Sequence, residues 1–279
     1  MAFALYVDGR GVPYAEYGRY RGIDIGRRRS PLAVAERGLW YWNKFLAPPD
    51  APRVLLSYDW RKWPLNKEHD PGDPAAAAMM LRHCADHLLD AIVSRPGFLV
   101  WVYDYDFSFG TRRGWRSAHA QAVGMQALLR ATEITGNHRY AAPLGGLLRA
   151  FPVPVERGGL ACPLPSGRRW YEKMADAGNE QPKVLNGMLF ALLGLWDVAA
   201  RHPDGAVARE AAALAADGLE AALEMLPRFD LGDWSAYALD GRRASVHYHR
   251  IHVAQLDAIA ALTGDARVAA WGRRFRDHA

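Results

Sequence analysis

The chain has 279 residues, of which 50% are hydrophobic and 23% are charged, and its net charge is +5 at neutral pH. This composition is typical of a globular protein with a large core and excludes a disordered or fibrous chain. No apolar run has the length of a membrane span, and the first residues lack the pattern of a secretory leader. Cys84 and Cys162 lie far apart and indicate free thiols, so we expect an unprocessed cytoplasmic protein with no membrane span.

The first ninety residues are predicted to form an arm followed by two helices. Residues 1–30 are rich in Gly, Tyr and Arg and lack helical periodicity, so we expect loops or short strands that wrap around the body. Ser30 is a favourable N-cap and Pro31 suits a first turn, which predicts a helix over 31–47 that ends at a Pro-Pro pair. A second helix is expected over 74–94, where Arg-Pro-Gly follows.

Residues 98–109, FLVWVYDYDFSF, alternate apolar and polar side chains, which predicts a strand with aromatic rings on both faces. Two interpretations stay open for its centre. Tyr103, Asp104, Tyr105 and Asp106 would line a sugar site, because carbohydrate binding needs aromatic faces beside carboxylates. The alternative is a plain two-sided strand.

The remainder of the chain is dominated by helical periodicity. A Pro/Gly-rich stretch at 151–173 predicts a hairpin, and residues 183–200 are apolar on nearly every face, which predicts a helix enclosed by others. Helices paired by short turns predict a mainly α fold: an (α/α) barrel or toroid of helical hairpins with a few short β-strands. No linker separates two parts, so we expect a single domain over residues 1–279. The other helices are expected over 115–135, up to about 150, over 205–226, over 244–262 and from 265 onward.

The segment ASVHYHRIHVAQLDAIAAL places a tyrosine and three histidines at the start of an otherwise apolar helix capped by Ser245. Three interpretations compete. The polar groups form a hydrogen-bonded core and cap network; His247, His249 and His252 converge on a metal; or Tyr248 takes part in acid/base chemistry. No further ligand motif accompanies the histidines, so we expect neither a metal nor a cofactor.

Arginines cluster along the chain and favour a polyanionic partner, unless they form an ordinary solvated surface. No nucleic-acid-binding motif accompanies them, so nucleic acid is not expected as a partner. The clusters comprise Arg19, Arg21, Arg27, Arg28 and Arg29; Arg112, Arg113 and Arg116; Arg168 and Arg169; and Arg242 and Arg243.

Several sequence blocks, in order over about 165 residues, resemble the C-terminal catalytic domain of the D-glucuronyl C5-epimerase family. The clearest similarity covers residues 115–279, and the upstream part loosely resembles shorter bacterial members. The blocks are W-x-S-A-x-A-Q at 115–121, LLRA at 128–131, GG at 158–159, WYE at 170–172, VLNGMLFALLGLWD at 184–197, LPRFDLGDWSAYAL at 226–239 and YHRIHVAQL at 248–256.

The resemblance implies an (α/α) barrel and epimerisation at C5 of a hexuronic acid unit, with glucuronic acid in a heparosan-like chain as the family's substrate. The expected partner is therefore an acidic, uronate-containing glycan or glycoconjugate, and a homodimer is left open. The family's tyrosine blocks correspond to Tyr237 and Tyr248, which we expect to move the C5 proton.

The chain departs from the family at the W-Y-E-E-Y-P motif, which here reads WYEKMA over 170–175. The second glutamate is replaced by Lys173 and the second tyrosine by Met174. Lys173 would pair with the uronate carboxylate, or act as a base if desolvated, or be an ordinary solvent lysine. Glu172 would take the part of the missing carboxylate, although neighbouring strand residues point to opposite faces.

The expected catalytic residues are therefore Tyr237, Tyr248, Glu172 and Lys173. Two alternatives to epimerisation stay open: a polysaccharide lyase, which forms the same carbanion, and a noncatalytic protein that binds an acidic glycan. The expected substrate-binding residues are Trp170, Tyr171, Asn186, Gln121, His249, Arg250, His252 and Tyr105.

Overall fold

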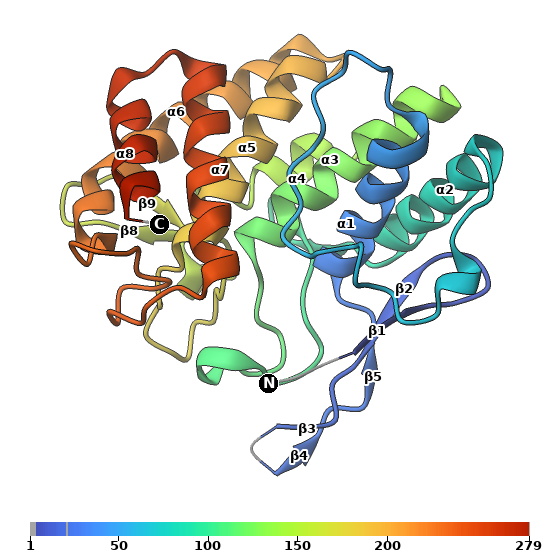
Figure 1. Cartoon of the computed structure of the whole chain (residues 1–279), viewed down its shortest axis with the longest axis horizontal. Coiled ribbons are helices and arrows are strands. Elements are labelled where there is room, and N and C mark those ends of the chain that lie inside the picture. The colour runs from blue at the N-terminus through green and yellow to red at the C-terminus, as the bar shows by residue number, and fades with distance from the viewer. Residues whose placement is uncertain (1–3, 21, 279) are drawn as a thin grey trace.

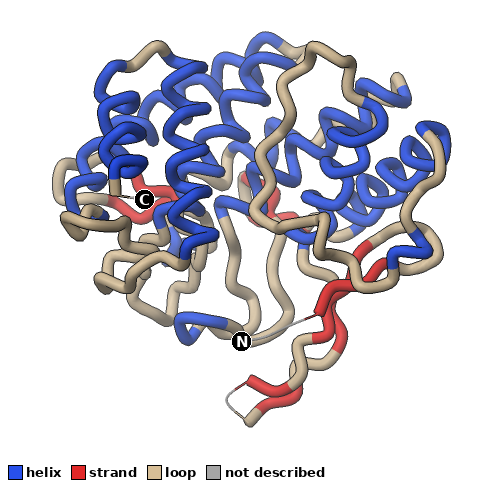
Figure 2. The backbone as a smooth tube through the Cα atoms, viewed as in Figure 1, coloured by secondary structure: helices blue, strands red, loops and turns tan. Residues whose placement is uncertain are grey.

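The computed structural model describes residues 4–20 and 22–278 and is mainly helical, as expected (Figure 1). Strands are confined to an N-terminal arm and to short pairs beside the helices (Figure 2). The helices are α1 (Pro31–Tyr41), α2 (Pro74–Asp90), α3 (Ala118–Thr135), α4 (Leu144–Leu148), α5 (Leu185–Arg201), α6 (Gly205–Met225), α7 (Val246–Thr263) and α8 (Ala266–Asp277).

Helices α1, α3, α5 and α7 form a row in which each packs on the next. Helices α2, α6 and α8 pack on the outside of this row, against α1, α5 and α7 respectively. The four helices of the row all begin on the same side of the helical layer, the lower side in Figure 1, with loops and the arm below them. Their N-terminal ends therefore gather in one region, and the candidate site lies there.

Short polar side chains start these helices, as the sequence predicts. Ser30, Ser117 and Ser245 are the N-caps of α1, α3 and α7, and each side-chain hydroxyl accepts a backbone N–H of the first turn. Helix α5 has no such cap, but the Leu185 N–H donates to the Tyr237 carbonyl at 3.1 Å. The N-terminal ends of α1, α3 and α7 are thus fixed by local capping hydrogen bonds, and that of α5 by a long-range backbone hydrogen bond.

Helix α5 is enclosed by other helices, as its apolar sequence predicts. It packs on α3, α6 and α7. Its glycines allow close approach: a Cβ on Gly194 would lie 2.6 Å from the Ala122 Cβ, and one on Gly187 would lie 2.3 Å from the Lys173 Cβ. Gly187 therefore lets Lys173 cross the start of α5.

The arm contains short strands, as expected, but only part of it lies against the body. An antiparallel sheet has the order β1-β2-β5, and β2 packs on α1, whereas the β3-β4 hairpin extends beyond the helices (Figure 1). The expectation that the whole arm wraps the body is therefore wrong for this hairpin. The strands of the arm are β1 (Ala4–Val7), β2 (Pro13–Glu16), β3 (Arg19–Tyr20), β4 (Ile23–Asp24) and β5 (Arg27–Arg28).

Two further boundaries differ from those predicted. Helix α2 ends at Asp90 because Val93–Arg95 (β6) pairs with Phe98–Val100 (β7). The strand expected over 98–109 therefore ends at Val100, and the following aromatic residues form an irregular segment beside the cavity described below. Helix α1 is also shorter than predicted, because a turn of π-helix follows over Trp42–Leu46.

Other expectations are confirmed. The hairpin expected within 151–173 is formed by β8 (Ala161–Pro163) and β9 (Arg169–Tyr171), with Cys162 opposite Trp170. Cys84 and Cys162 are free thiols. Within the described ranges, no helix is both long enough and apolar enough to cross a bilayer.

Candidate active site

A cavity of about 860 Å³ opens where the helix row begins. Three of its lining residues, Ser30, Ser117 and Ser245, are the N-caps of α1, α3 and α7. Helix N-termini carry partial positive charge, so several that meet at one cavity favour an anionic ligand there. The sequence gives no direct signal for this convergence, because the caps lie far apart along the chain.

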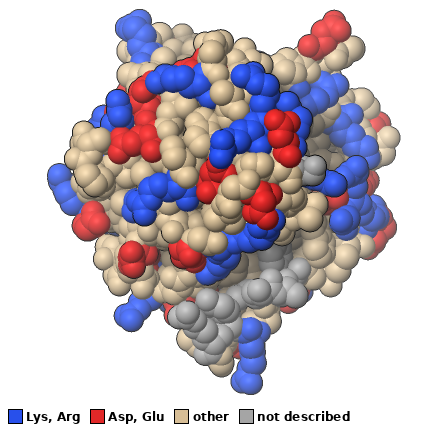
Figure 3. Space-filling view, turned by 60° about the vertical axis from the view of Figure 1, so that its left-hand side comes forward, with Lys and Arg blue, Asp and Glu red and all other residues tan. Residues whose placement is uncertain are grey.

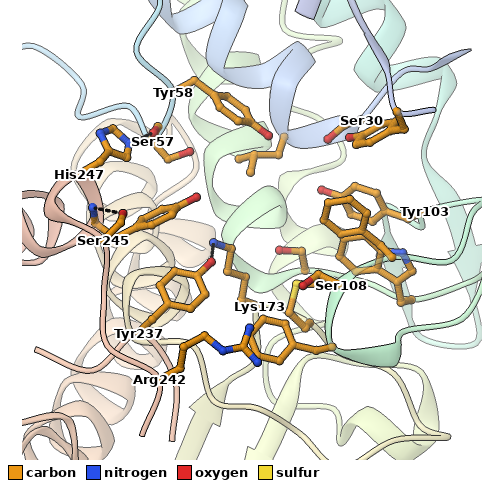
Figure 4. Close-up of a pocket in the computed structure, with 18 of the residues that line it drawn as sticks. Ser30, Ser57, Tyr58, Tyr103, Ser108, Lys173, Tyr237, Arg242, Ser245 and His247 are labelled. Atoms are coloured by element: carbon orange, nitrogen blue, oxygen red, sulfur yellow. Dashed lines mark hydrogen bonds between the residues drawn. The ribbon is translucent and has the colours of Figure 1, made fainter. Parts of the chain in front are cut away.

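Lys173 lies centrally among the residues that surround this cavity (Figure 4). It lies two residues after the end of β9. Its partly buried ammonium group donates to Asn186 Oδ1 at 3.1 Å and to Tyr237 Oη at 3.1 Å. Desolvation lowers the pKa of Lys173, whereas nearby Tyr248 raises it. Lys173 forms no ion pair within the described part of the chain, so its charge is available to a ligand.

Tyr237 and Tyr248 line the same cavity beside this lysine. Their ring centroids are 4.8 Å apart, and the Lys173 Nζ lies 5.4 Å and 5.6 Å from the two ring centroids. Burial raises the pKa of Tyr237 to about 12, and a hydrogen bond with Tyr248 partly offsets this. Burial also raises the pKa of Tyr248, with the charge of Lys173 as the main opposing influence. A cation thus sits beside two phenols whose rings are close neighbours.

The wall above these tyrosines comes from a segment that the sequence motifs do not mark. The buried carboxylate of Glu36, on α1, accepts the backbone N–H groups of Ser57 and Tyr58 at 2.8 Å and 2.9 Å and the Trp60 indole N–H at 3.3 Å. The segment held in this way brings Ser57 and Tyr58 to the cavity. His247 Nε2 lies 2.9 Å from the Ser57 carbonyl oxygen, which joins this wall to α7.

The opposite wall is aromatic, as Figure 4 shows around Tyr103. Tyr103 stacks on Trp115 with ring centroids 3.7 Å apart, and Phe107 is nearly parallel to Trp115 at 5.9 Å. Tyr105, an expected binding residue, also lines this side, where its hydroxyl donates to the Tyr17 hydroxyl at 2.9 Å. The interpretation as part of a sugar site therefore remains a proposal for Tyr103 and Tyr105, whereas the expected carboxylates Asp104 and Asp106 lie outside the lining.

Glu172 does not reach the cavity, although Lys173 does. Its side chain is fully buried on the other side of the chain and accepts the backbone N–H groups of Met174 and Lys183 at 3.1 Å and 2.9 Å. Neighbouring residues in extended backbone point to opposite sides, which explains the separation. The structure thus gives Glu172 a role in holding the backbone around Lys173.

The three histidines of α7 do not converge. His249 Nδ1 and His252 Nδ1 both lie against the Ser235 hydroxyl, at 2.9 Å and 2.8 Å, while His247 faces the cavity. Burial lowers the pKa of His249 and lowers that of His252 to about 3, so both are neutral core residues. The expectation that His249 and His252 line the pocket is therefore wrong, because both lie on the face of α7 that meets Ser235.

The other expected binding residues also lie away from the cavity lining. Trp170, Tyr171 and Gln121 are buried in the core, where the Gln121 amide donates to the carbonyls of Leu99 and Leu147 at 3.0 Å. Arg250 is exposed and lies outside the lining set. Asn186 is fully buried and acts on the site indirectly, by accepting the Lys173 hydrogen bond.

The clustered arginines are mostly paired with carboxylates. On the face that Figure 3 brings forward, basic and acidic side chains are interspersed. Arg21 lies outside the described residues. Ion pairs with nitrogen-to-oxygen distances below 4 Å join Arg27 to Glu16, Arg28 to Asp104, Arg168 to Glu224, Arg169 to Asp217, Arg242 to Asp240 and Arg243 to Asp233.

Residues 97–277 match the family described as D-glucuronyl C5-epimerase C-terminus. The chain is 32% identical over 182 residues to an uncharacterized protein of Methanocaldococcus jannaschii, over 64% of this chain and 58% of that protein. It is 29% identical over 167 residues to the D-glucuronyl C5-epimerase of Caenorhabditis elegans, over 54% of this chain and 27% of that protein. The match thus covers 58% and 27% of the lengths of these two relatives, and the chain belongs to the D-glucuronyl C5-epimerase C-terminus family.

Proposed function

We propose that the chain is an isomerase that inverts C5 of a uronic acid unit in an acidic glycan or glycoconjugate. The observation that carries this proposal is the unpaired ammonium group of Lys173, 3.1 Å from the Tyr237 hydroxyl and beside Tyr248. The name of the nematode relative supports D-glucuronate as the unit. Family membership and the packed helix row support an incomplete (α/α) barrel as the scaffold.

Lys173 is assigned to the substrate carboxylate. Removing the C5 proton places negative charge on the adjacent carboxyl group, so a cation there stabilises the transition state more than the ground state. Lys173 occupies the position where the family's motif carries a glutamate, and it faces the cavity as that function requires. The helix N-termini of α1, α3 and α7 add to the positive potential.

Tyr248 is assigned as the base and Tyr237 as the acid. Burial raises the pKa of Tyr248, and the charge of Lys173 is the main influence that lowers it, so we assign the phenolate to Tyr248 on the strength of this contact. The Tyr248 phenolate takes the C5 proton, and the electrons of the C5–H bond move into the carboxyl group. Tyr237, whose pKa is about 12, then donates its proton to C5 from the other face.

The same pair is able to restore the starting protonation state. After inversion, Tyr248 carries a proton and Tyr237 is the phenolate. Once the product has left the space between them, the two side chains, whose ring centroids are 4.8 Å apart, are close enough for the proton to pass from Tyr248 to Tyr237 without another residue. No cofactor is needed in this sequence of steps, because every bond broken is matched by one formed.

The test is proton NMR of uronosides in deuterium oxide, with absorbance recorded in parallel. Epimerisation predicts deuterium at C5 and new signals of the C5 epimer without cleavage. A 4,5-unsaturated product would instead assign the chain to the lyases, since elimination breaks the bond to the C4 oxygen. No exchange with any uronoside that binds would refute catalysis and favour the binding-protein alternative.

A further inference from the structure

We propose that the cavity binds a uronoside with a single carboxylate, whose remaining part is uncharged and presents an apolar face, in preference to a polyanionic chain. The inference rests on the proposed function only in taking the anionic end of the ligand to be a uronate. It is carried by two observations: how the charges around the cavity are paired, and how the aromatic wall uses its polar atoms.

The first observation is that the cavity offers one free cation. Of the Lys and Arg side chains that line it within residues 4–20 and 22–278, Lys173 alone has no carboxylate partner. At the mouth, Lys62 lies 3.7 Å from Asp59, Arg242 lies 3.1 Å from Asp240 and Arg243 lies 2.9 Å from Asp233. Each exposed Lys or Arg side chain at the rim is thus paired with an aspartate, and the net charge of these pairs is close to zero.

A chain of many carboxylates gains its affinity from a continuous stripe of unpaired cations. The rim does not supply such a stripe, because Arg242 and Arg243 are each already paired with an aspartate that offsets their charge. Lys173 instead supplies a single cation near the centre of the cavity, and the N-termini of α1 and α7 add partial positive charge at its walls. That arrangement fits one anionic group.

The second observation is that the aromatic wall has little hydrogen-bonding capacity left. The Trp115 indole N–H donates to the Tyr105 carbonyl at 2.9 Å, and the Tyr105 hydroxyl donates to the Tyr17 hydroxyl. Burial raises the pKa of Tyr17 to about 12, and hydrogen bonds with Tyr105 and Ser30 partly offset this increase. The polar atoms of the wall therefore bond within it, and the surface that Tyr103, Phe107 and Trp115 contribute is mainly carbon.

The two features face one space. In Figure 4, Lys173 lies between the side that carries Tyr237 and His247 and the side that carries Tyr103. The cavity, of about 860 Å³, is within the range of roughly 300–1,000 Å³ that holds a compact ligand. A uronate whose carboxylate reaches Lys173 thus has space to extend an aglycone, or an uncharged neighbouring sugar, along the aromatic wall.

The experiment compares three ligands by titration calorimetry on the full chain: methyl glucuronide, phenyl glucuronide and a heparosan oligosaccharide with several carboxylates. We expect phenyl glucuronide to bind at least about tenfold more tightly than methyl glucuronide, the gain for covering one apolar ring. We also expect the oligosaccharide to gain little from its extra charges and to lose little affinity when salt is raised. Equal affinity for the two glucuronides, or strongly salt-dependent tight binding of the oligosaccharide, would overturn the inference.

Two variants test the aromatic wall and the paired rim separately. Phe107→Leu keeps an apolar side chain but removes the ring, so it should reduce the advantage of the phenyl over the methyl glucuronide. Arg243→Gln, at the paired rim, should leave binding of both glucuronides unchanged and weaken the oligosaccharide less than twofold; a larger loss would reveal the cationic track that we argue against. Deuterium exchange at C5 is scored separately. Preferential binding without exchange would refute only the proposed catalysis, and exchange without the preference would refute only this inference.

Discussion

Replacing Lys173 by Met tests the role of the cavity lysine most sharply, because the side chain keeps its length and loses its charge. In the proposed reaction the ammonium group binds the uronate and lowers the pKa of the Tyr248 base. At the 5.6 Å between Lys173 Nζ and the Tyr248 ring centroid, unit charges in an effective dielectric constant of about 20 interact by roughly 3 kcal/mol. The pKa of Tyr248 should therefore rise in the variant, because the cation that lowers it is gone.

Loss of the charged hydrogen bond to the carboxylate adds about 2 kcal/mol to the barrier relative to free enzyme and substrate. Together the two effects predict a decrease in kcat/KM for C5 exchange of about a thousandfold or more. They also predict that the alkaline rise of the rate, which reports ionisation of Tyr248, moves to higher pH in the variant. The free energy of unfolding should not fall much, since the lost charge is partly buried and unpaired.

The assay is deuterium incorporation at C5, measured by NMR over a range of pH, with thermal unfolding as the check on folding. Lys62→Met is the matched control: it removes a lysine at the rim that pairs with Asp59, and it should change the rate less than twofold. A folded Lys173→Met protein with a rate and pH profile like those of the wild type would refute the assignment.

The remaining predictions concern the tyrosines, a glycine and a buried histidine. Tyr248→Phe should abolish C5 exchange, whereas Tyr237→Phe should allow exchange with retention of configuration, because base and acid are then the same residue; inversion in Tyr237→Phe would contradict the assignment. Gly187→Ala should reduce exchange by displacing the lysine, since the new Cβ would meet its Cβ at 2.3 Å, and should cost about 1–3 kcal/mol of stability. Gly194→Ala, which is equally crowded against α3, should lose stability but keep its exchange rate per folded molecule. The pKa of His252 is lowered to about 3, so the folded state resists protonation and stability should fall as pH drops below about 6.5, by up to about 1.4 kcal/mol per pH unit from this group. Urea unfolding at several pH values should show a shallower acid dependence in His252→Gln, and an unchanged slope would contradict this.

Local features of the fold are predictable from the sequence because they depend on neighbouring residues. The caps at Ser30 and Ser245 and the enclosed helix α5 follow from side-chain chemistry and apolar spacing. For the segment 98–109, the same reasoning predicts a strand that continues beyond Val100, but the strand ends there. Its alternation is that of a strand, yet the later aromatic rings pack on one another beside the cavity, and no strand among residues 4–20 and 22–278 pairs with them.

The site is predictable only in part, since most of its contacts join distant parts of the chain. Sequence motifs mark Tyr237, Tyr248 and Lys173, and the structure brings all three together. No sequence motif marks Glu36, because the four groups that donate hydrogen bonds to its carboxylate belong to residues more than twenty positions further along the chain. His249 illustrates the opposite error: a polar residue near a helix start that serves the core by bonding Ser235.

In the proposed reaction, the cluster of Tyr237, Lys173 and Tyr248 exchanges the hydrogen at C5 of a uronate. The most direct measurement is the NMR signal of C5–H in deuterium oxide, followed for phenyl glucuronide with the wild-type protein and with Tyr248→Phe at equal concentration. We predict loss of the C5–H signal with the wild type, appearance of the inverted epimer, and no change with the variant. A signal that persists with the wild type while the ligand is bound, or that disappears equally with both proteins, would contradict the account.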